Sequence, residues 1–167
     1  SGWGHLIGDE GSAYSIGIRI LRAVMKSYDG RLENTILSEL LLDKLSLSNE
    51  EEIVSYVYNS KITKEHIAAL AILIEEGIKQ KDGIAIRIAD ETVEDLVETV
   101  LPACKKLGFT NQCFKLIIDG SVLVNNTYIR ESFIEKITNR VEGVTISTME
   151  KDAAYGAALM VLRELER

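Results

Sequence analysis

The sequence lacks the features that mark several large classes of protein. Its two cysteines are too few for a disulfide framework, so we expect a reducing compartment, the cytoplasm. The longest uninterrupted apolar run is Ile67–Ile74, well below the roughly 20 residues that a membrane-spanning helix needs. Acidic residues outnumber basic ones by 26 to 19, which argues against binding to nucleic acid or to an anionic membrane surface. This balance does not exclude a nucleotide, because backbone amides at helix N-termini bind phosphates without net positive charge.

Common phosphate-binding and metal-binding motifs are also missing. The sequence has neither a P-loop nor a GxGxxG turn. Its histidines and cysteines are His5, His66, Cys104 and Cys113, and their spacing matches neither a zinc site nor a cysteine–histidine catalytic pair. We therefore expect no metal site and no nucleophilic cysteine in this chain.

What the sequence does contain is one globular domain with a strong helical pattern. The 167 residues are 46% hydrophobic and 27% charged, which suits a single buried core. We expect Gly30 and Gly108 to end two helices. Asn49 and Thr63 are the expected N-caps of two others, and Pro102 should kink or restart a long helix. Apolar residues recur at helical spacing over residues 18–28, 32–41, 67–78 and 84–101.

The last third of the sequence changes character. Residues 114–118 and 144–149 are short and rich in β-branched residues, and they predict two strands. Helices are expected between them, from about 128 to 138, and after them, from 152 to 166. This order predicts a βαβ unit with parallel strands, and so an α/β fold.

Glycines surround a pair of carboxylates near the start of the sequence. Residues 2–14 read GWGHLIGDEGSAY, and glycine lets the backbone approach a ligand closely. Asp9 and Glu10 precede a predicted helix, so one carboxylate could accept hydrogen bonds from ligand hydroxyls while the other caps the helix. The residues alone favour a simpler interpretation, a turn followed by an N-cap.

Two later segments carry weaker signals. Gly120 and Ser121 follow the first predicted strand and enter a helix, which is where nucleotides bind in open α/β sheets. Many strands end in such a turn, so this signal is weak alone. Small residues around Gly156 and Ala157 allow close packing of a helix against a strand or a flat ring, and packing is the simpler interpretation.

Together these segments resemble one family. Residues 2–14 closely resemble the GWGxxxGDEGSxY signature of N-acetylglucosamine kinases and of the related BadF/BadG/BcrA/BcrD ATPase family. The resemblance continues through residues 67–69, 81–83 and 101–102. Residues 118–122 resemble the adenosine loop of hexokinases, and residues 154–158 are similar to the closing GAA of both groups. The match covers essentially the whole chain.

The resemblance implies a fold and a place in a larger protein. The family belongs to the actin-like ATPase, or sugar kinase, superfamily, whose two ribonuclease-H-like domains enclose ATP and sugar. Residues 1–167 resemble the C-terminal domain alone, and the abrupt start at Ser1 suggests a chain cut within a longer protein. We expect an α/β ribonuclease-H-like domain with a mixed, mostly parallel sheet and a large helical layer packed against it.

The resemblance also assigns roles to residues. It places Gly2, Trp3, Asp9 and Glu10 at the amino-sugar pocket. It places Gly120, Ser121, Gly156 and Ala157 beside the adenosine of ATP. Asp119 departs from the glycine usual in the amino-sugar kinases, and Ser1 replaces the usual first glycine.

The phosphate loops and the general-base aspartate of the family belong to segments that this sequence does not contain. ATP and Mg²⁺ would therefore be held mainly by the missing N-terminal domain. Phosphoryl transfer depends on such positioning, so we expect the chain alone to fold without turning over and to contribute no catalytic residue. An exposed cleft face would favour a homodimer.

Three functions remain open from the sequence. The first is a kinase of N-acetylglucosamine, glucosamine or a related hexose. The second is a BadF/BcrA-type ATPase that activates a CoA-ester reductase or dehydratase through an iron–sulfur cluster. Cys104 and Cys113 lack the glycine-rich context of such cluster ligands, which favours the kinase. The third is a sugar-binding regulatory module without catalysis.

Overall fold

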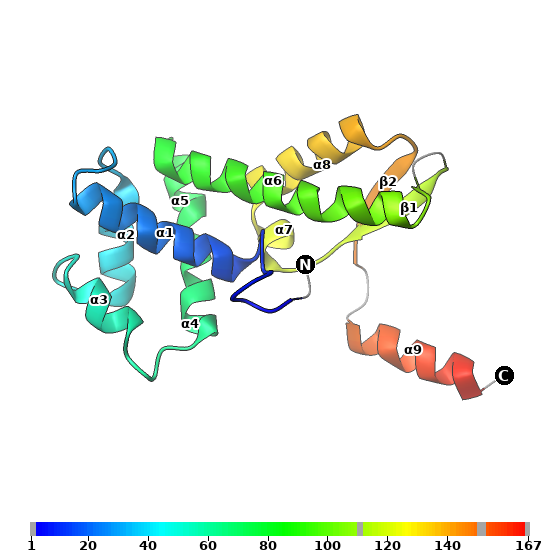
Figure 1. The fold of residues 1–167 in the computed structure, drawn as a ribbon, viewed down its shortest axis with the longest axis horizontal. Helices are drawn as coiled ribbons and strands as arrows, with labels where there is room; N and C mark the ends of the chain where they lie inside the picture. The colour runs from blue at the N-terminus through cyan, green and yellow to red at the C-terminus, as the bar shows by residue number, and fades with distance from the viewer. Residues whose placement is uncertain (1–2, 110–111, 150–152, 166–167) are drawn as a thin grey trace.

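The chain folds around one long helix. The computed structural model describes residues 3–109, 112–149 and 153–165. Figure 1 shows α6 running along the main body, with α1–α5 at one end and the strands at the other. The elements in chain order are α1 (Ala13–Tyr28), α2 (Ile36–Leu45), α3 (Glu52–Val57), α4 (Lys64–Ala68), the 3-10 helix η1 (Ala69–Ile72), α5 (Leu73–Lys79), α6 (Gly83–Lys106), β1 (Phe114–Ile118), α7 (Ser121–Asn125), α8 (Thr127–Arg140), β2 (Val144–Thr148) and α9 (Ala153–Leu165).

Side-chain caps fix where the main helices begin. The Ser12 hydroxyl accepts a hydrogen bond from the Ser15 N–H at 3.1 Å, which starts α1. Asp82 caps α6 by accepting from the Ala85 N–H at 2.8 Å. The same carboxylate also accepts from the Thr35 hydroxyl and from the Ile36 N–H, both at 3.0 Å. One aspartate therefore joins the starts of α2 and α6.

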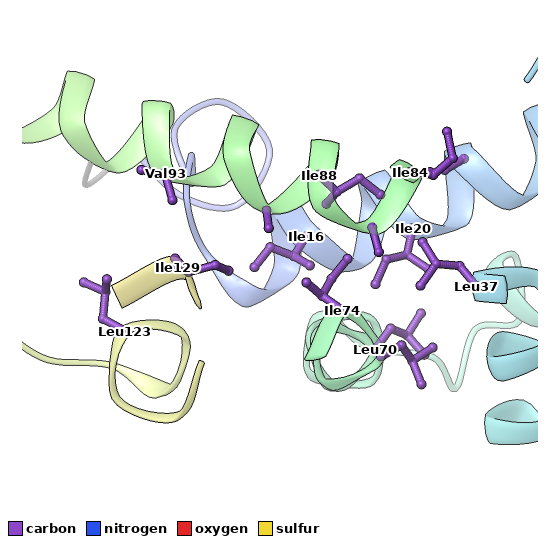
Figure 2. Packing of buried hydrophobic residues seen from close by; sticks show 14 of the residues in the cluster. Ile16, Ile20, Leu37, Leu70, Ile74, Ile84, Ile88, Val93, Leu123 and Ile129 are labelled. Atoms are coloured by element: carbon purple, nitrogen blue, oxygen red, sulfur yellow. The ribbon is translucent and has the colours of Figure 1, made fainter. Parts of the chain in front are cut away.

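The core lies where α1, α5 and α6 meet. Figure 2 shows Ile16 and Ile20 of α1 facing Ile74 of α5, with Ile88 of α6 beside them. All four side chains are at most 5% exposed. Burying an isoleucine of this kind contributes about 1.5–3 kcal/mol to the free energy of unfolding, so this cluster fixes α1 against its neighbours.

The two strands pair in parallel and in register. Phe114 lies opposite Val144, and Ile118 lies opposite Thr148. The connection runs through α7 and α8. The buried residues of α8 are Ile129, Phe133 and Ile137. The predicted α/β class and the parallel βαβ unit are confirmed.

The expected large helical part of the fold is present, but its helices do not all pack directly on the sheet. Of the helices, α8 packs on β2 and α6 packs on α8, whereas α2–α5 lie at the opposite end of the body (Figure 1). The physical reason is that the apolar faces of α4 and α5 are already covered by α1 and α6.

Some helix boundaries also differ from expectation. Thr63 begins α4 as predicted, and the chain turns at Gly30 and Gly108. The helix after Asn49 begins only at Glu52, whose N–H donates to Asn49 Oδ1 at 3.3 Å. Pro102 does not restart a helix, because α6 continues through it with buried Val97 and Cys104 on either side. In the described residues, no helix is long and apolar enough to cross a membrane.

Candidate functional site

The glycine-rich segment folds into a loop in front of α1. Gly4 and Gly8 form an isolated antiparallel bridge, and the Gly8 N–H donates to the Gly4 carbonyl at 2.9 Å. The next turn is closed by the Ser12 N–H, which donates to the Asp9 carbonyl at 3.2 Å. These bonds place Asp9 and Glu10 directly before the first turn of α1.

Gly11 fixes this loop to α6. Its φ of +75° is a conformation that side chains other than glycine rarely adopt. Its N–H donates to Asp95 Oδ2 at 3.1 Å. A Cβ at this position would lie 2.6 Å from Cγ and Cδ2 of Leu96, so the loop approaches α6 as closely as glycine allows.

Arg19 of α1 completes this contact. Its guanidinium donates to Asp95 Oδ2 at 2.8 Å and to the Thr92 hydroxyl at 3.4 Å. Its Nε lies 3.6 Å from a carboxylate oxygen of Glu91. Asp95 and Arg19 are only 19% and 24% exposed, so the pair is screened less than an ion pair in open solvent. We refer to the contact among Gly11, Arg19 and Asp95 as the loop anchor.

A cavity of about 380 Å³ opens between the loop and α1. Asp9 is half-buried in its wall, and Glu10 lies at its exposed rim. The ring of His5 meets that of Tyr14 edge to face, with centroids 5.1 Å apart. The remaining lining comes from Leu6, Ile7, Gly8, Ser15, Ile18, Arg19 and Arg22.

Of the three expected sugar residues that the structure describes, two lie at this cavity. Asp9 and Glu10 line it. Trp3 is 76% exposed and does not line it. Gly2 lies outside the described residues.

A second cavity, of about 410 Å³, lies on the other side of α1. Ser121 lines it at the start of α7, and Gly120 precedes it with a φ of +94°. The walls are mostly apolar, with alanines of α4 and η1 and a few polar groups from Asn125, Asn126 and Glu75. An apolar pocket with few polar groups is typical of a site for a small molecule or cofactor.

The start of α1 separates the two cavities. Ala13 and Ile16 line the second cavity, whereas Tyr14, Ser15 and Ile18 line the first. Successive side chains point to different faces of a helix, so one short helical segment serves both cavities. Ligands in the two cavities would lie on either side of this segment.

Gly156 and Ala157 are not brought to the second cavity. Both lie on α9, where they are exposed, and neither belongs to its lining. Figure 1 shows α9 apart from the main body. A Cβ at Gly156 would meet nothing within 4 Å, so close packing does not explain the small residues there.

The other face of α6 holds α8. The Tyr128 hydroxyl donates to Asp90 at 2.8 Å, which raises the pKa of Tyr128. Lys136 donates to Glu94 at 2.5 Å and Arg140 lies 3.5 Å from it. The hydrogen bond from Lys136 is the main reason that the pKa of Glu94 is lowered.

The structure offers little to a metal ion. Among residues 3–109, 112–149 and 153–165, no group of three or more His, Cys, Asp or Glu side chains could hold one. Cys104 is a buried free thiol of α6, and Cys113 is an exposed free thiol before β1.

Asp95 and Arg19 are the site residues that sequence reasoning missed. They are separated by 76 residues, and Asp95 is 84 residues from Gly11. No local pattern links such distant positions. The available signal was Arg19 itself, a charged residue next to the apolar positions Ile18 and Ile20 of a predicted helix.

Comparison with known proteins gives consistent results. Residues 1–161 match the sequence profile of the BadF/BadG/BcrA/BcrD ATPase family. An N-acetylmuramic acid/N-acetylglucosamine kinase of Clostridium acetobutylicum is 35% identical over 165 residues, which cover 99% of this chain and 54% of that protein. An N-acetyl-D-glucosamine kinase of Dictyostelium discoideum is 32% identical over 163 residues, which cover 96% of this chain and 51% of that protein.

A solved structure shows the same fold. The crystal structure of a putative N-acetylglucosamine kinase from Chromobacterium violaceum superposes with a TM-score of 0.72 at 22% identity, over 95% of this chain and 50% of that one. The chain thus spans about half the length of each protein that it matches.

Proposed function

Because the chain belongs to the BadF/BadG/BcrA/BcrD ATPase family, we propose that it is the C-terminal domain of an ATP-dependent kinase of N-acetylated amino sugars. The observation that carries the proposal is the pair of cavities on either side of the start of α1. One offers carboxylates to sugar hydroxyls, and the other offers apolar walls to a nucleotide base. The half-length match supports a second domain in the full-length protein.

In this proposal the glycine-rich loop holds the sugar. Asp9 accepts hydrogen bonds from sugar hydroxyls, and Glu10 assists from the rim of the cavity. Hydrogen bonds to a charged acceptor contribute about 1.5–3 kcal/mol each, enough to fix which hydroxyl faces the nucleotide. Gly2 and Trp3 stay predictions based on resemblance.

The second cavity holds the adenosine end of ATP. Ser121 and the polar groups of Asn125 and Asn126 face this cavity and can orient the base or ribose. Bound ATP with Mg²⁺ supplies the phosphoryl group that the sugar hydroxyl receives. We assign the phosphates, the Mg²⁺ and the base that takes the hydroxyl proton to the second domain. Gly156 and Ala157 stay predictions based on resemblance.

The alternative functions have less support. The relatives named above carry the names of sugar kinases, not of CoA-ester reductase activators. Cys104 and Cys113, the only cysteines, line neither of the two cavities. A non-catalytic module would bind the amino sugar without transferring phosphate to it.

Phosphate transfer tests the proposal. The full-length protein should form ADP when both ATP and N-acetylglucosamine are present, and residues 1–167 alone should not. An Asp9→Asn variant should lose at least about tenfold in kcat/KM, since tenfold corresponds to about 1.4 kcal/mol. Asp43→Asn is the matched control, because Asp43 is exposed near the end of α2 and lines neither cavity. Full-length protein that binds the sugar but forms no ADP would favour the regulatory module, and robust turnover by residues 1–167 would contradict the domain assignment.

A further inference from the structure

We propose that Asp95 is a positioning residue for the amino sugar: it holds the glycine-rich loop through Gly11 and keeps Arg19 from pairing with Asp9. The inference rests on the proposed function, since it concerns how the loop and the Asp9 carboxylate are positioned to bind the sugar. Asp95 does not line that cavity and acts through the loop and through Arg19.

The first part of the argument concerns the loop. Trp3, Leu6 and Ile7 are each more than 75% exposed, so side-chain packing does not hold them. The two carboxylates lie between two buried glycines, Gly8 before them and Gly11 after them. Gly11 makes the hydrogen bond to α6. Its N–H is bonded to Asp95 rather than to α1. Backbone hydrogen bonds close the turns of the loop itself, and the bond from Gly11 to Asp95 joins the loop to α6. The orientation of Asp9 relative to α6 therefore depends in part on Asp95.

The second part concerns charge. Arg19 lines the same cavity as Asp9 and Glu10. Its guanidinium instead turns to α6, where Asp95 accepts from it at 2.8 Å and Glu91 lies at 3.6 Å. Glu91 is 53% exposed and makes the longer contact, so Asp95 is the stronger partner. Without the Asp95 charge, Arg19 would pair with the carboxylate that the sugar hydroxyls need.

A single carboxylate oxygen of Asp95 links the two parts of the argument. Oδ2 of Asp95 accepts from the Gly11 N–H and from Arg19 Nη2. Buried Thr92, one turn earlier on α6, accepts from Arg19 Nη1 and donates to the Ile88 carbonyl at 2.7 Å. The guanidinium is thus held against α6 by Asp95 and Thr92.

The test compares Asp95→Asn, Arg19→Gln and the double variant in the full-length protein. Asp95→Asn should raise the KM for N-acetylglucosamine about tenfold and leave the KM for ATP within about twofold. Arg19→Gln alone should change the sugar KM less, because Asp95 still accepts from Gly11. The double variant should recover part of the loss, because the cation that Asp95 holds is then gone, whereas Arg22, which also lines the cavity, is the same in every variant. Glu94→Gln is the matched control, since it removes a neighbouring carboxylate that faces α8.

Three results would overturn the proposal: an unchanged sugar KM in Asp95→Asn, an equal effect of Glu94→Gln, or a double variant worse than either single one.

A spectroscopic readout separates this proposal from the proposed function. In residues 1–167 without substrate, Asp95→Asn should speed hydrogen exchange of the Gly11 amide and change the fluorescence of Trp3, the single tryptophan. If those changes occur but the full-length protein phosphorylates no sugar, the loop anchor is supported and the proposed kinase function is refuted. Their absence in an active kinase would refute the anchor alone.

Discussion

The glycine-rich loop and the turn at Gly120 both enter a helix beside a cavity, yet they are held differently. Gly11 is bonded to Asp95, and an added Cβ would collide with Leu96. Gly120 has a similar positive φ, but an added Cβ would meet nothing within 4 Å. The position of the loop thus depends on a distant helix, whereas the turn depends on its own backbone.

The long helix α6 shows the same contrast on its two faces. Toward α1 it presents Asp95, in a contact whose partners are 19% and 24% exposed. Toward α8 it presents Glu94, in a contact whose partners are 44% and 34% exposed. Solvent screens the second contact more, so the face of α6 toward α1 should tolerate less change than the face toward α8.

The largest expected effect is that of Gly11→Ala. The positive φ and the collision with Leu96 together should lower the free energy of unfolding by about 2–4 kcal/mol. Urea unfolding followed by circular dichroism measures this loss. A Leu96→Ala background should reduce the loss by making room for the new methyl group. An unchanged midpoint in Gly11→Ala would show that the loop does not pack on α6.

A smaller effect is expected for Gly120→Ala. Only backbone strain opposes it, so the free energy of unfolding should fall by about 1–2 kcal/mol. The KM for ATP should change more than the KM for N-acetylglucosamine, because the turn leads to Ser121. A loss as large as that of Gly11→Ala would remove the contrast between the two segments.

The smallest effect is expected for Glu94→Gln, and it should depend on pH. The hydrogen bond from Lys136 lowers the pKa of Glu94 in the folded state, so the contribution to stability is present above the unfolded pKa. It is lost as the pH falls through the lowered folded value. Urea midpoints of wild type and Glu94→Gln should differ slightly at neutral pH and converge well below about pH 4, the usual glutamate range. A difference that grows at low pH would contradict this assignment.

Local chemistry explains what the sequence predicted. Thr63 begins a helix in which the His66 side chain accepts a hydrogen bond from the Thr63 N–H at 3.1 Å. Gly30 and Gly108 adopt positive φ values at or near helix ends, as glycine does most easily. Short segments rich in β-branched residues likewise predicted both strands, and the strand–helix–strand order predicted that they run parallel.

Long-range contacts explain what the sequence did not predict. Asp82 joins α2 to α6 through Thr35, 47 residues away, and Asp95 reaches Gly11 across 84 residues. The motif led to Asp9 and Glu10 because both lie within one short segment of the sequence. Asp95 meets Gly11 and Arg19 only in the folded chain, and the periodic spacing of apolar residues does not indicate which distant residues meet.

Separate titrations of the full-length protein test the account most directly. Amide chemical shifts should be followed as N-acetylglucosamine is added to one sample and ADP to another. The sugar should shift residues 8–12, and ADP should shift residues 120–126, with the start of α1 responding to both. Two ligands that shift the same segment, or an amino sugar that leaves residues 8–12 unmoved, would contradict the assignment of two cavities to two substrates.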